Sequence, residues 1–249
     1  MITSLTSPKI ARVRRLLETH TPKERQELGQ FVVEGLRGVR TAHEVAKQGV
    51  VEVFATEKWI DEFPTATLIS EQVAQKISET VSTQGIFAVM ELPKVADDLH
   101  KAEKVALFLE LQDPGNAGTI IRNAHAFAFD AIVFSTGSVD PFSGKVVRAS
   151  VGSIVSVPTY TGIEIENLLK SMAQSHQIVA FDMRGDEISS FKLGAPILMI
   201  FGNEARGLPE LIREDDQIKK LKIPMPGGAE SLNVASAAAI AMYEMSQQL

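Results

Sequence analysis

Cysteine is absent from the 249-residue chain, which excludes disulfides, thiolate nucleophiles and cysteine-ligated metal sites together. No uninterrupted apolar run is long enough to span a bilayer, and the amino-terminal segment MITSLTSPKIARVRRLLETH has no apolar signal-peptide region. We therefore expect a cytoplasmic protein that does not insert into a membrane. Hydrophobic residues make up 45% of the chain, enough to bury a sizeable core in one large or two modest domains.

Several catalytic and binding signatures are also missing. The sequence contains no G-x-G-x-x-G opening a helix and no G-x-x-x-x-G-K-[ST], so the usual dinucleotide fingerprint and the P-loop are excluded. The absence of G-x-S-x-G disfavours a serine hydrolase. No pair of histidines has the spacing of metal ligands, and we expect no metal site; the histidines are His20, His43, His100, His125 and His176.

The chain lacks an excess of positive charge, since its formal net charge is −6. This argues against indiscriminate binding of nucleic acid, although an acidic protein can carry a local basic patch. Residues 1–25 hold such a cluster: Lys9, Arg12, Arg14, Arg15, Lys23 and Arg25, against Glu18 and Glu24. The cluster fits an RNA-binding surface, and it fits a solvated helix face about as well.

Alternating strand and helix patterns fill both halves of the chain. Residues 1–93 are predicted to form a first α/β domain, with strands at FVVEG, VVEVFAT and GIFAVMELP and helices over 36–48 and 70–81. The polar segment 94–103 is predicted to be a linker, and 104–249 a second domain. In that domain the predicted strands are VALFLEL, AIVFS, SVPTY, QIVAFDM, ILMIFG and LKIP. Because several are continuously apolar, they predict a mostly parallel sheet covered by helices.

Three loops of the second domain share one design. DPGNAG, GNEARGLP and PMPGGAESLN each follow a predicted buried strand, contain Gly or Pro, and lead into a helix. Ligands of open α/β sheets bind beyond the carboxyl ends of the strands, so the three loops suggest one crevice. Any one of them taken alone is explained as well by a tight turn.

The polar residues of these loops favour the crevice. Asn116 has an alternative role as a helix N-cap, and Glu204 has one as a local partner of Arg206. Arg122 lies in the early turns of a mainly apolar helix, where the macrodipole disfavours a cation by roughly 0.3–1 kcal/mol. The structural alternative is an arginine that snorkels to solvent or forms a salt bridge, with Asp113 as the candidate partner.

Together the loops resemble the three motifs of the SpoU/TrmH-type RNA ribose 2′-O-methyltransferases, in the SPOUT superfamily. N-x-G-x-x-x-R is matched at 116–122, the second motif by FGNEARGLP at 201–209, and the third by IPMPGGAESLNVASAAA at 223–239. In the first half, FVVEGLRGVRTA and ISETVSTQGIFAVM resemble the α/β substrate-binding domain, related to RNA-binding ribosomal proteins, that many members carry.

The resemblance implies a fold, a cofactor and a partner. The carboxy-terminal α/β domain would contain a deep trefoil knot, bind S-adenosylmethionine there, and form a homodimer with the active site near the subunit interface. The substrate would be structured RNA, most simply ribosomal RNA, with transfer RNA as the alternative. Two other classes stay open: a non-catalytic RNA-binding or ribosome-assembly protein of this fold, and a small-molecule enzyme with a nucleotide cofactor.

The resemblance also assigns residues. The cofactor pocket would involve Gly202, Ile223, Met225 and Leu232, and the catalytic residues would be Arg122, Asn116, Glu204, Ser231 and Asn233. Arg122 would contact the RNA phosphate and the 2′-oxygen, with proton acceptance as a further role. Ser231 and Asn233 are both cap-type residues at the start of one helix. We expect Ser231 to cap this helix and Asn233 to point into the crevice.

Overall fold

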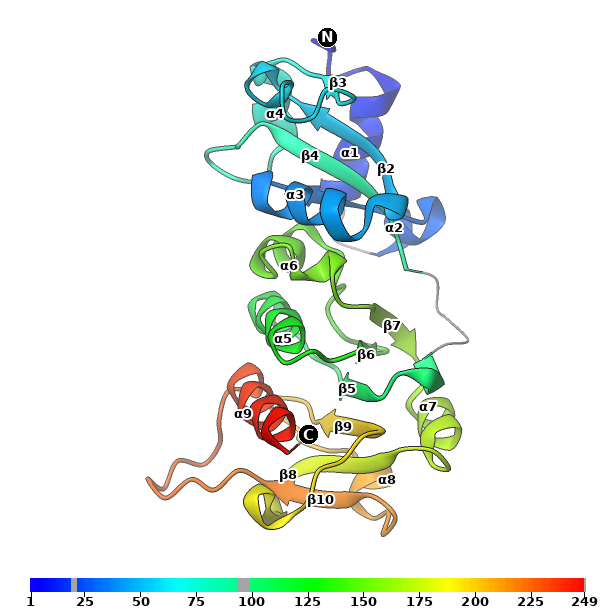
Figure 1. Ribbon diagram of the computed structural model, residues 1–249, viewed down its shortest axis with the longest axis vertical. Coiled ribbons are helices and arrows are strands. Elements are labelled where there is room, and N and C mark those ends of the chain that lie inside the picture. The colour runs from blue at the N-terminus through cyan, green and yellow to red at the C-terminus, as the bar shows by residue number, and fades with distance from the viewer. Residues whose placement is uncertain (19–21, 94–98, 249) are drawn as a thin grey trace. The chain divides into compact units, whose positions relative to one another are not determined.

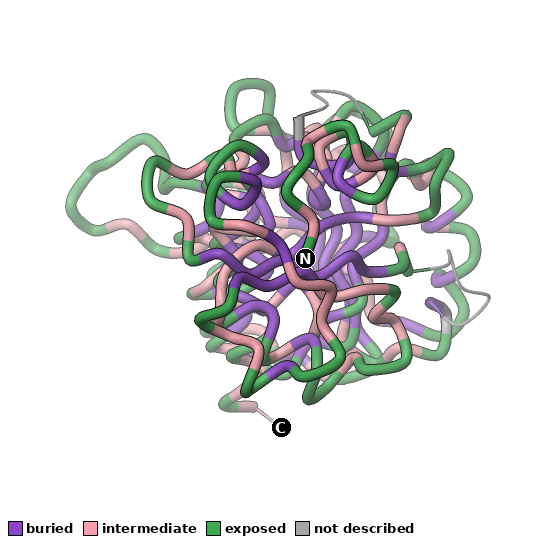
Figure 2. Tube along the Cα trace, turned by 90° about the horizontal axis from the view of Figure 1, so that it is seen from above, coloured by how far each residue is buried: buried purple, intermediate pink, exposed green. Residues whose placement is uncertain are grey.

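The computed structural model describes residues 1–18, 22–93 and 99–248, which divide into two units (Figure 1). The first comprises residues 1–94 with 140–156, and the second comprises 95–139 with 157–249. Figure 2 shows the buried residues in purple, which come from strands and helices alike, and the exposed ones in green, many of them on the outer loops. Within the described ranges, no helix has the length and apolar character needed to cross a bilayer.

The first unit is built on a four-stranded sheet. Its strand order is β1 (Gln30–Glu34), β4 (Ile86–Glu91), β2 (Val50–Ala55) and β3 (Thr67–Leu68). β4 pairs antiparallel with both β1 and β2, whereas β3, which the sequence pattern did not predict, pairs parallel with β2. The 3-10 turns η1 (Lys47–Gly49) and η2 (Glu57–Trp59) flank β2.

Helices cover both faces of this sheet. α1 (Pro8–Glu18) and α4 (Glu71–Ile77) contribute Ile10, Val13 and Val73 to a core with strand residues Val32 and Phe87. α3 (Leu36–Val45) and α6 (Gly144–Ala149) pack on β4 and β1 respectively, and α2 (Lys23–Leu28) also contacts β1. A Cβ on Gly38 of α3 would lie 2.5 Å from Val33 Cγ1, so glycine permits the close approach of α3 to β1.

The segment 140–156 belongs to the first unit although it lies far from it in sequence. Arg25, 1% exposed, donates from Nε to Asp140 Oδ2 at 2.7 Å and from Nη1 to the Leu16 carbonyl at 2.7 Å. Phe142 packs on Phe31 with ring centroids 5.0 Å apart. The domain boundaries predicted at residues 93 and 104 did not include this insertion, and these boundaries stay predictions. Residues 94–98 of the predicted linker lie outside the described residues.

The second unit contains a six-stranded sheet in which every strand pair is parallel, which confirms the predicted sheet type. The strand order is β10 (Lys219–Lys222), β8 (Gln177–Glu187), β9 (Ile197–Phe201), β5 (Lys104–Phe108), β6 (Ala131–Ser135) and β7 (Thr159–Ile163). β7 and β10 are offset from the predicted SVPTY and LKIP segments, and β8 continues four residues beyond QIVAFDM.

Helices pack on both faces of the parallel sheet. α7 (Ile165–Met172) and α8 (Glu210–Arg213) bury Leu168, Met172 and Ile212 in one core with β5, β6 and β9. On the other face α5 (Pro114–Ala126) lies beside α9 (Val234–Gln247), as Figure 1 shows. The remaining 3-10 turns are η3 (Leu99–Lys101), η4 (Ser153–Val155) and η5 (Ile188–Ser190). This arrangement places the loops after β5, β9 and β10 at one edge of the sheet.

Candidate active site

A cavity of about 370 Å³ lies at the carboxyl ends of β9 and β10 and beside the middle of β8; we call it the strand-end cavity. Phe181 and Phe201 line it, and their rings stack with centroids 4.7 Å apart. Phe108 stacks on Phe201 from β5 at 4.9 Å, so aromatic rings continue across three adjacent strands. The cavity thus has aromatic side chains in its lining, as is typical of small-molecule sites.

The loop after β9 gives the cavity a backbone wall. A Cβ on Gly202 would lie 2.5 Å from the Gly207 carbonyl carbon, so the loop can fold back only with glycine at 202. Asn203 Oδ1 accepts hydrogen bonds from the backbone N–H of Ala205 at 2.9 Å and of Arg206 at 3.0 Å. Its Nδ2 donates to the Glu110 carbonyl at 2.9 Å. Asn203 therefore fixes the loop, a role that sequence reasoning did not assign.

The loop between β10 and α9, orange in Figure 1, projects from the sheet before the chain returns as α9. Ile223, Met225 and Leu232 from this loop line the strand-end cavity together with Gly202, so all four predicted cofactor residues meet at one cavity. Leu232 keeps 37% of its surface exposed in this single chain. An apolar side chain at the edge of a cavity is suited to cover a bound ligand.

The start of α9 differs from the prediction. Asn233, not Ser231, is the N-cap: its Oδ1 accepts from the backbone N–H of Ala235 at 2.9 Å and of Ser236 at 3.3 Å. The predicted cap was wrong because α9 begins at Val234, and a cap side chain must reach the second and third amides of its helix. Ser231 precedes the cap and lines the cavity with Asn233.

Asn233 also belongs to a polar chain across three loops. Its Nδ2 donates to Asn116 Oδ1 at 2.9 Å, and Asn116 Nδ2 donates to Glu204 Oε1 at 3.4 Å. Asn116 is therefore not a cap; Asp113 caps α5 by accepting from the Asn116 N–H at 2.7 Å. The sequence offered an ion pair with Arg206 as the alternative role of Glu204. Among the described residues, Arg206 instead forms its ion pair with Glu110. The three motifs thus meet through side-chain contacts.

Arg122 stands apart from this chain of contacts. It is exposed on α5 and does not line the strand-end cavity. In the part of the chain that the structure describes, Arg122 makes no ion pair with Asp113, whose carboxylate is occupied as the α5 cap. The structure therefore does not show the salt bridge that would explain Arg122. Among the described residues, Arg122 also takes no part in the hydrogen bonds that join Asn116, Glu204 and Asn233.

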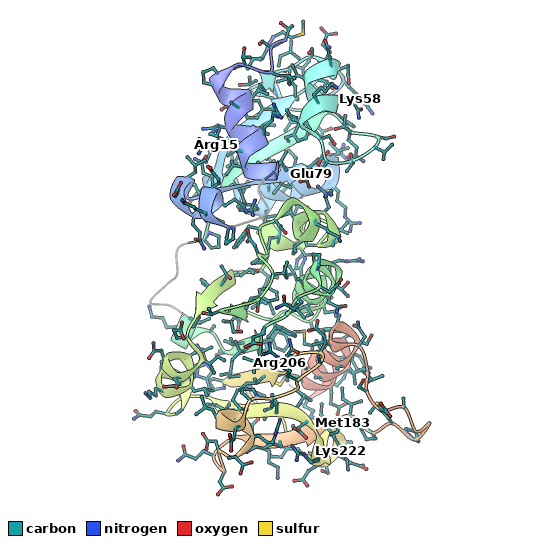
Figure 3. The ribbon with its side chains drawn as sticks, turned by 180° about the vertical axis from the view of Figure 1, so that it is seen from behind. Arg15, Lys58, Glu79, Met183, Arg206 and Lys222 are labelled. Carbon is teal, nitrogen blue, oxygen red and sulfur yellow. The ribbon has the colours of Figure 1, made fainter. Side chains whose placement is uncertain are left out.

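Asp182 is a cavity residue that the motifs did not reveal. It follows the apolar core of β8 and lines the cavity with Met183 of β8 and Lys222 of the neighbouring β10, both labelled in Figure 3. Burial raises the pKa of the Asp182 carboxyl, but hydrogen bonds from the Arg184 backbone and side chain, and the charges of Arg184 and Arg213, outweigh this and leave the pKa below its ordinary value. The cavity therefore carries a carboxylate that stays ionised at neutral pH.

The predicted basic cluster is largely neutralised within the first unit. Five of its six cations form ion pairs: Lys9 and Arg12 with Glu52, Arg15 with Glu24, Lys23 with Glu27, and Arg25 with Asp140. The sixth, Arg14, also makes an interaction. Paired or buried cations attract phosphate less than free ones, so this cluster is a weaker candidate for RNA contacts than the sequence suggested. Across the described ranges, no group of three or more potential metal ligands was found.

Comparison with known proteins decides which family this geometry represents. A family model described as the SpoU rRNA Methylase family matches residues 103–243. The chain belongs to this family. A second model, described as an MRM3-like substrate binding domain, matches residues 8–88 of this SpoU-family protein. The resemblance drawn from the three motifs and from the first half of the chain is confirmed.

Relatives of this SpoU-family protein extend over most of its length. A 23S rRNA (guanosine(2553)-2′-O)-methyltransferase of Bacillus subtilis is 32% identical, over 96% of this chain and 97% of that protein. A 23S rRNA (uridine(2479)-2′-O)-methyltransferase of Streptomyces viridochromogenes is 30% identical, over 90% and 85%. The AdoMet-bound rRNA methyltransferase from Sinorhizobium meliloti has a TM-score of 0.83 at 27% identity, covering 100% of this chain and 97% of that one.

Proposed function

We propose that the protein transfers a methyl group from S-adenosylmethionine to a ribose 2′-hydroxyl of ribosomal RNA. The observation that carries the proposal is the strand-end cavity, where Gly202, Ile223, Met225 and Leu232 meet the polar chain that ends at Asn233. Relatives over the whole chain are named as 23S rRNA 2′-O-methyltransferases, and a structural neighbour was solved with AdoMet bound.

The cavity suits this cofactor in three respects. Its aromatic side chains can contact a flat ring, its glycine loops leave main-chain groups accessible, and the ionised Asp182 complements a ligand that carries positive charge. The residues that would hold S-adenosylmethionine are Gly202, Ile223, Met225 and Leu232. When bound, the cofactor supplies a methyl group already activated on a sulfonium.

The chain's own residues would orient the hydroxyl and stabilise the negative charge that develops on its oxygen as the proton passes to water. In our proposal Ser231, Asn233, Asn116 and Glu204 form a polar rim that holds the ribose in line with the cavity. Arg122 would contact the RNA phosphate and stabilise the developing negative charge on the 2′-oxygen. A free guanidinium has a pKa above about 12, so positioning suits Arg122 better than proton acceptance.

The proposal includes a homodimer and the deep trefoil knot of the carboxy-terminal unit. Support for the dimer comes from α5 and α9, which lie side by side and each expose a stripe at helical spacing. The α9 stripe includes Ile240, 41% exposed, and Tyr243, 51% exposed, whereas the α5 stripe includes Thr119 and Arg122. A second copy docked on these stripes would bring Arg122 to its neighbour's cavity rather than its own. Support for the knot comes from membership of the family.

The share of the chain that solved structures cover favours ribosomal RNA over transfer RNA as the substrate. A solved structure titled for 2-OH methylation of C/U34 on tRNA covers 59% of this chain with a TM-score of 0.54. The Sinorhizobium meliloti rRNA methyltransferase covers 100% with a TM-score of 0.84. The first unit, matched by the substrate-binding model, thus has a counterpart in the ribosomal RNA enzyme.

The test has a cofactor arm and an RNA arm. Calorimetry should detect S-adenosylmethionine binding that is unchanged by a chelator, because no cluster of potential metal ligands is found among the described residues. Labelled methyl should then appear on 23S rRNA from a strain lacking the gene, at a site that is 2′-O-methylated in the parent. Cofactor binding without transfer to any ribosomal RNA would support the non-catalytic or transfer RNA alternatives instead.

A further inference from the structure

The first unit contains a cavity of about 250 Å³ that is separate from the strand-end cavity; we call it the first-unit cavity. Its aliphatic wall includes Val33, Val147 and Val151. Polar groups line the other side, among them Ser82 and Gln84 from the loop before β4. A cavity with one aliphatic wall and a polar edge can admit a flat ring and read the polar atoms on its rim.

Glu34, at the end of β1, is the residue in this cavity that most needs an explanation. Its side chain is 5% exposed, so the carboxylate has lost most of its hydration. Oε1 accepts hydrogen bonds from the hydroxyls of Ser78 and Thr80. Oε2 is buried without a hydrogen-bond donor among the described residues, which leaves a strong acceptor unsatisfied.

Arg148 does not satisfy this oxygen. Its Nη1 lies 3.7 Å from Glu34 Oε2, beyond hydrogen-bond range, and donates at 2.7 Å to Glu79 Oε2 instead. Glu79, labelled in Figure 3, does not line the cavity. Two carboxylates therefore share one guanidinium, and the one that lines the cavity keeps a buried oxygen for which no hydrogen-bond donor is found among the described residues.

A cation stands at the same cavity. Arg37 lines it from the first turn of α3 and is exposed, and within the described part of the chain no ion pair of Arg37 is found. Unlike the paired cations of α1 and α2, Arg37 remains able to contact a phosphate. The cavity thus combines an aliphatic wall, an unsatisfied acceptor and an exposed cation.

We propose that the first-unit cavity binds one unpaired RNA base that carries an amino group, with Glu34 Oε2 accepting from that amino group and Arg37 contacting the adjoining phosphate. Carboxylates accept from exocyclic base amino groups, and sequence-specific RNA recognition relies on bases splayed out of loops and bulges. Uracil, which has no amino group, would be disfavoured. This inference rests on the proposed function, since it concerns how the first unit recognises the RNA substrate.

Two matched substitutions test the role of the free oxygen. Glu34→Gln replaces the acceptor inside the cavity, whereas Glu79→Gln removes the other partner of Arg148 outside it. Filter binding to 23S rRNA from a strain lacking the gene should show affinity about tenfold weaker for Glu34→Gln and within about twofold of the parent for Glu79→Gln. Calorimetry should show unchanged S-adenosylmethionine affinity for both variants.

A second pair tests the cavity without altering a buried charge. Ser82 lines the cavity and is exposed, and its neighbour Val81 is 96% exposed and does not line it. Ser82→Trp should fill the cavity and weaken RNA binding about tenfold, whereas Val81→Trp should not. Chemical probing of the bound RNA should identify an amino-bearing base that the parent protects and the Ser82→Trp variant leaves reactive.

The outcomes separate this proposal from the proposed function. A parent protein that methylates 23S rRNA, with RNA affinity unchanged in both Glu34→Gln and Ser82→Trp, would overturn the base-binding cavity alone. Equal losses in Glu34→Gln and Glu79→Gln would also overturn it, because they would trace the effect to Arg148. A parent protein that neither binds nor methylates ribosomal RNA would instead remove the proposed function.

Discussion

The contacts of Arg122 within one protomer do not explain its role. The helix around it is held by the Asp113 cap, and its neighbour Asn116 takes part in the polar chain with Glu204 and Asn233. Arg122 takes part in neither. An exposed cation without an ion pair costs the fold little, so its presence is better explained by a ligand than by stability.

Arg122→Lys should separate charge from geometry. A guanidinium presents a planar fork that can engage a phosphate and a 2′-oxygen together, whereas an ammonium is a compact point charge. We predict nearly unchanged cofactor affinity, little loss of RNA affinity, and methyl transfer slowed by roughly 10²-fold. Single-turnover transfer at saturating cofactor and enzyme measures this step. A lysine variant within a few-fold of the parent would leave Arg122 outside the catalytic machinery.

Asp182 permits a prediction about pH. Its folded-state pKa lies below the ordinary value, so the stabilisation it provides is present above the unfolded pKa of about 4 and is lost as pH falls through the folded value. Asp182→Asn should therefore lower the free energy of unfolding at pH 7 by up to about 1 kcal/mol. The two proteins should converge as the pH falls below about 4. Urea unfolding across this range is the measurement, and a difference that persists in acid would assign the effect to packing.

From the sequence it was easier to predict which residues lie together at the site than to predict the role of each residue. Asn116, Glu204 and Asn233 follow three buried strands, and parallel strands bring such loops to one edge. Asn203 was missed because the acceptor of its Nδ2, the Glu110 carbonyl, comes from another part of the chain, and Asp182 was missed because its local partner Arg184 does not reveal that it lines the cavity. Local spacing contains no information about such partners until the strand order is known.

Among the secondary-structure elements, α9 connects local structure to the site most directly. Its N-cap Asn233 uses Oδ1 for the helix amides and Nδ2 for Asn116. The cap assignment failed from sequence because Ser231 and Asn233 are both good caps, and the choice depends on where the returning loop lets the helix begin. One amide side chain therefore both starts the helix and anchors the polar rim.

Two substitutions at Asn233 should separate these roles. Asn233→Ser keeps a capping oxygen but loses the donor to Asn116, whereas Asn233→Ala loses both. We predict an unfolding free energy close to the parent for Ser and lower by about 1 kcal/mol for Ala. Methyl transfer should fall about tenfold or more in both. Thermal unfolding and single-turnover transfer give the two readouts; activity that follows stability alone would reduce Asn233 to a cap.

At the scale of the whole molecule, the proposed dimer would complete a site that one protomer lacks. The strand-end cavity contains four of the five predicted catalytic residues at its rim or in contact with it, and Arg122 lies outside it. In the proposed dimer, the exposed stripes of α5 and α9 would form the isologous face that a two-fold axis requires.

Mixing two inactive variants tests this arrangement. Arg122→Ala removes the arginine, and Leu232→Asp puts a charge at the edge of the cavity and should prevent cofactor binding. If the arginine acts on the neighbouring protomer, random mixing places one intact site in each heterodimer and restores about a quarter of the parent's sites. The rate of methyl transfer after unfolding and refolding the mixture is the measurement. Transfer no faster than in the separate variants would place Arg122 and the cavity on the same protomer.

The insertion of residues 140–156 into the first unit also has a consequence for biosynthesis. Asp140 neutralises Arg25, which is 1% exposed, and Val147 and Val151 complete the wall of the first-unit cavity. While only the first 93 residues have left the ribosome, Arg25 lacks its counter-ion and that wall is missing. The first unit therefore cannot complete its folding when only its first 93 residues have been synthesised. It completes folding after β6 has been synthesised, when the nascent chain includes residue 156.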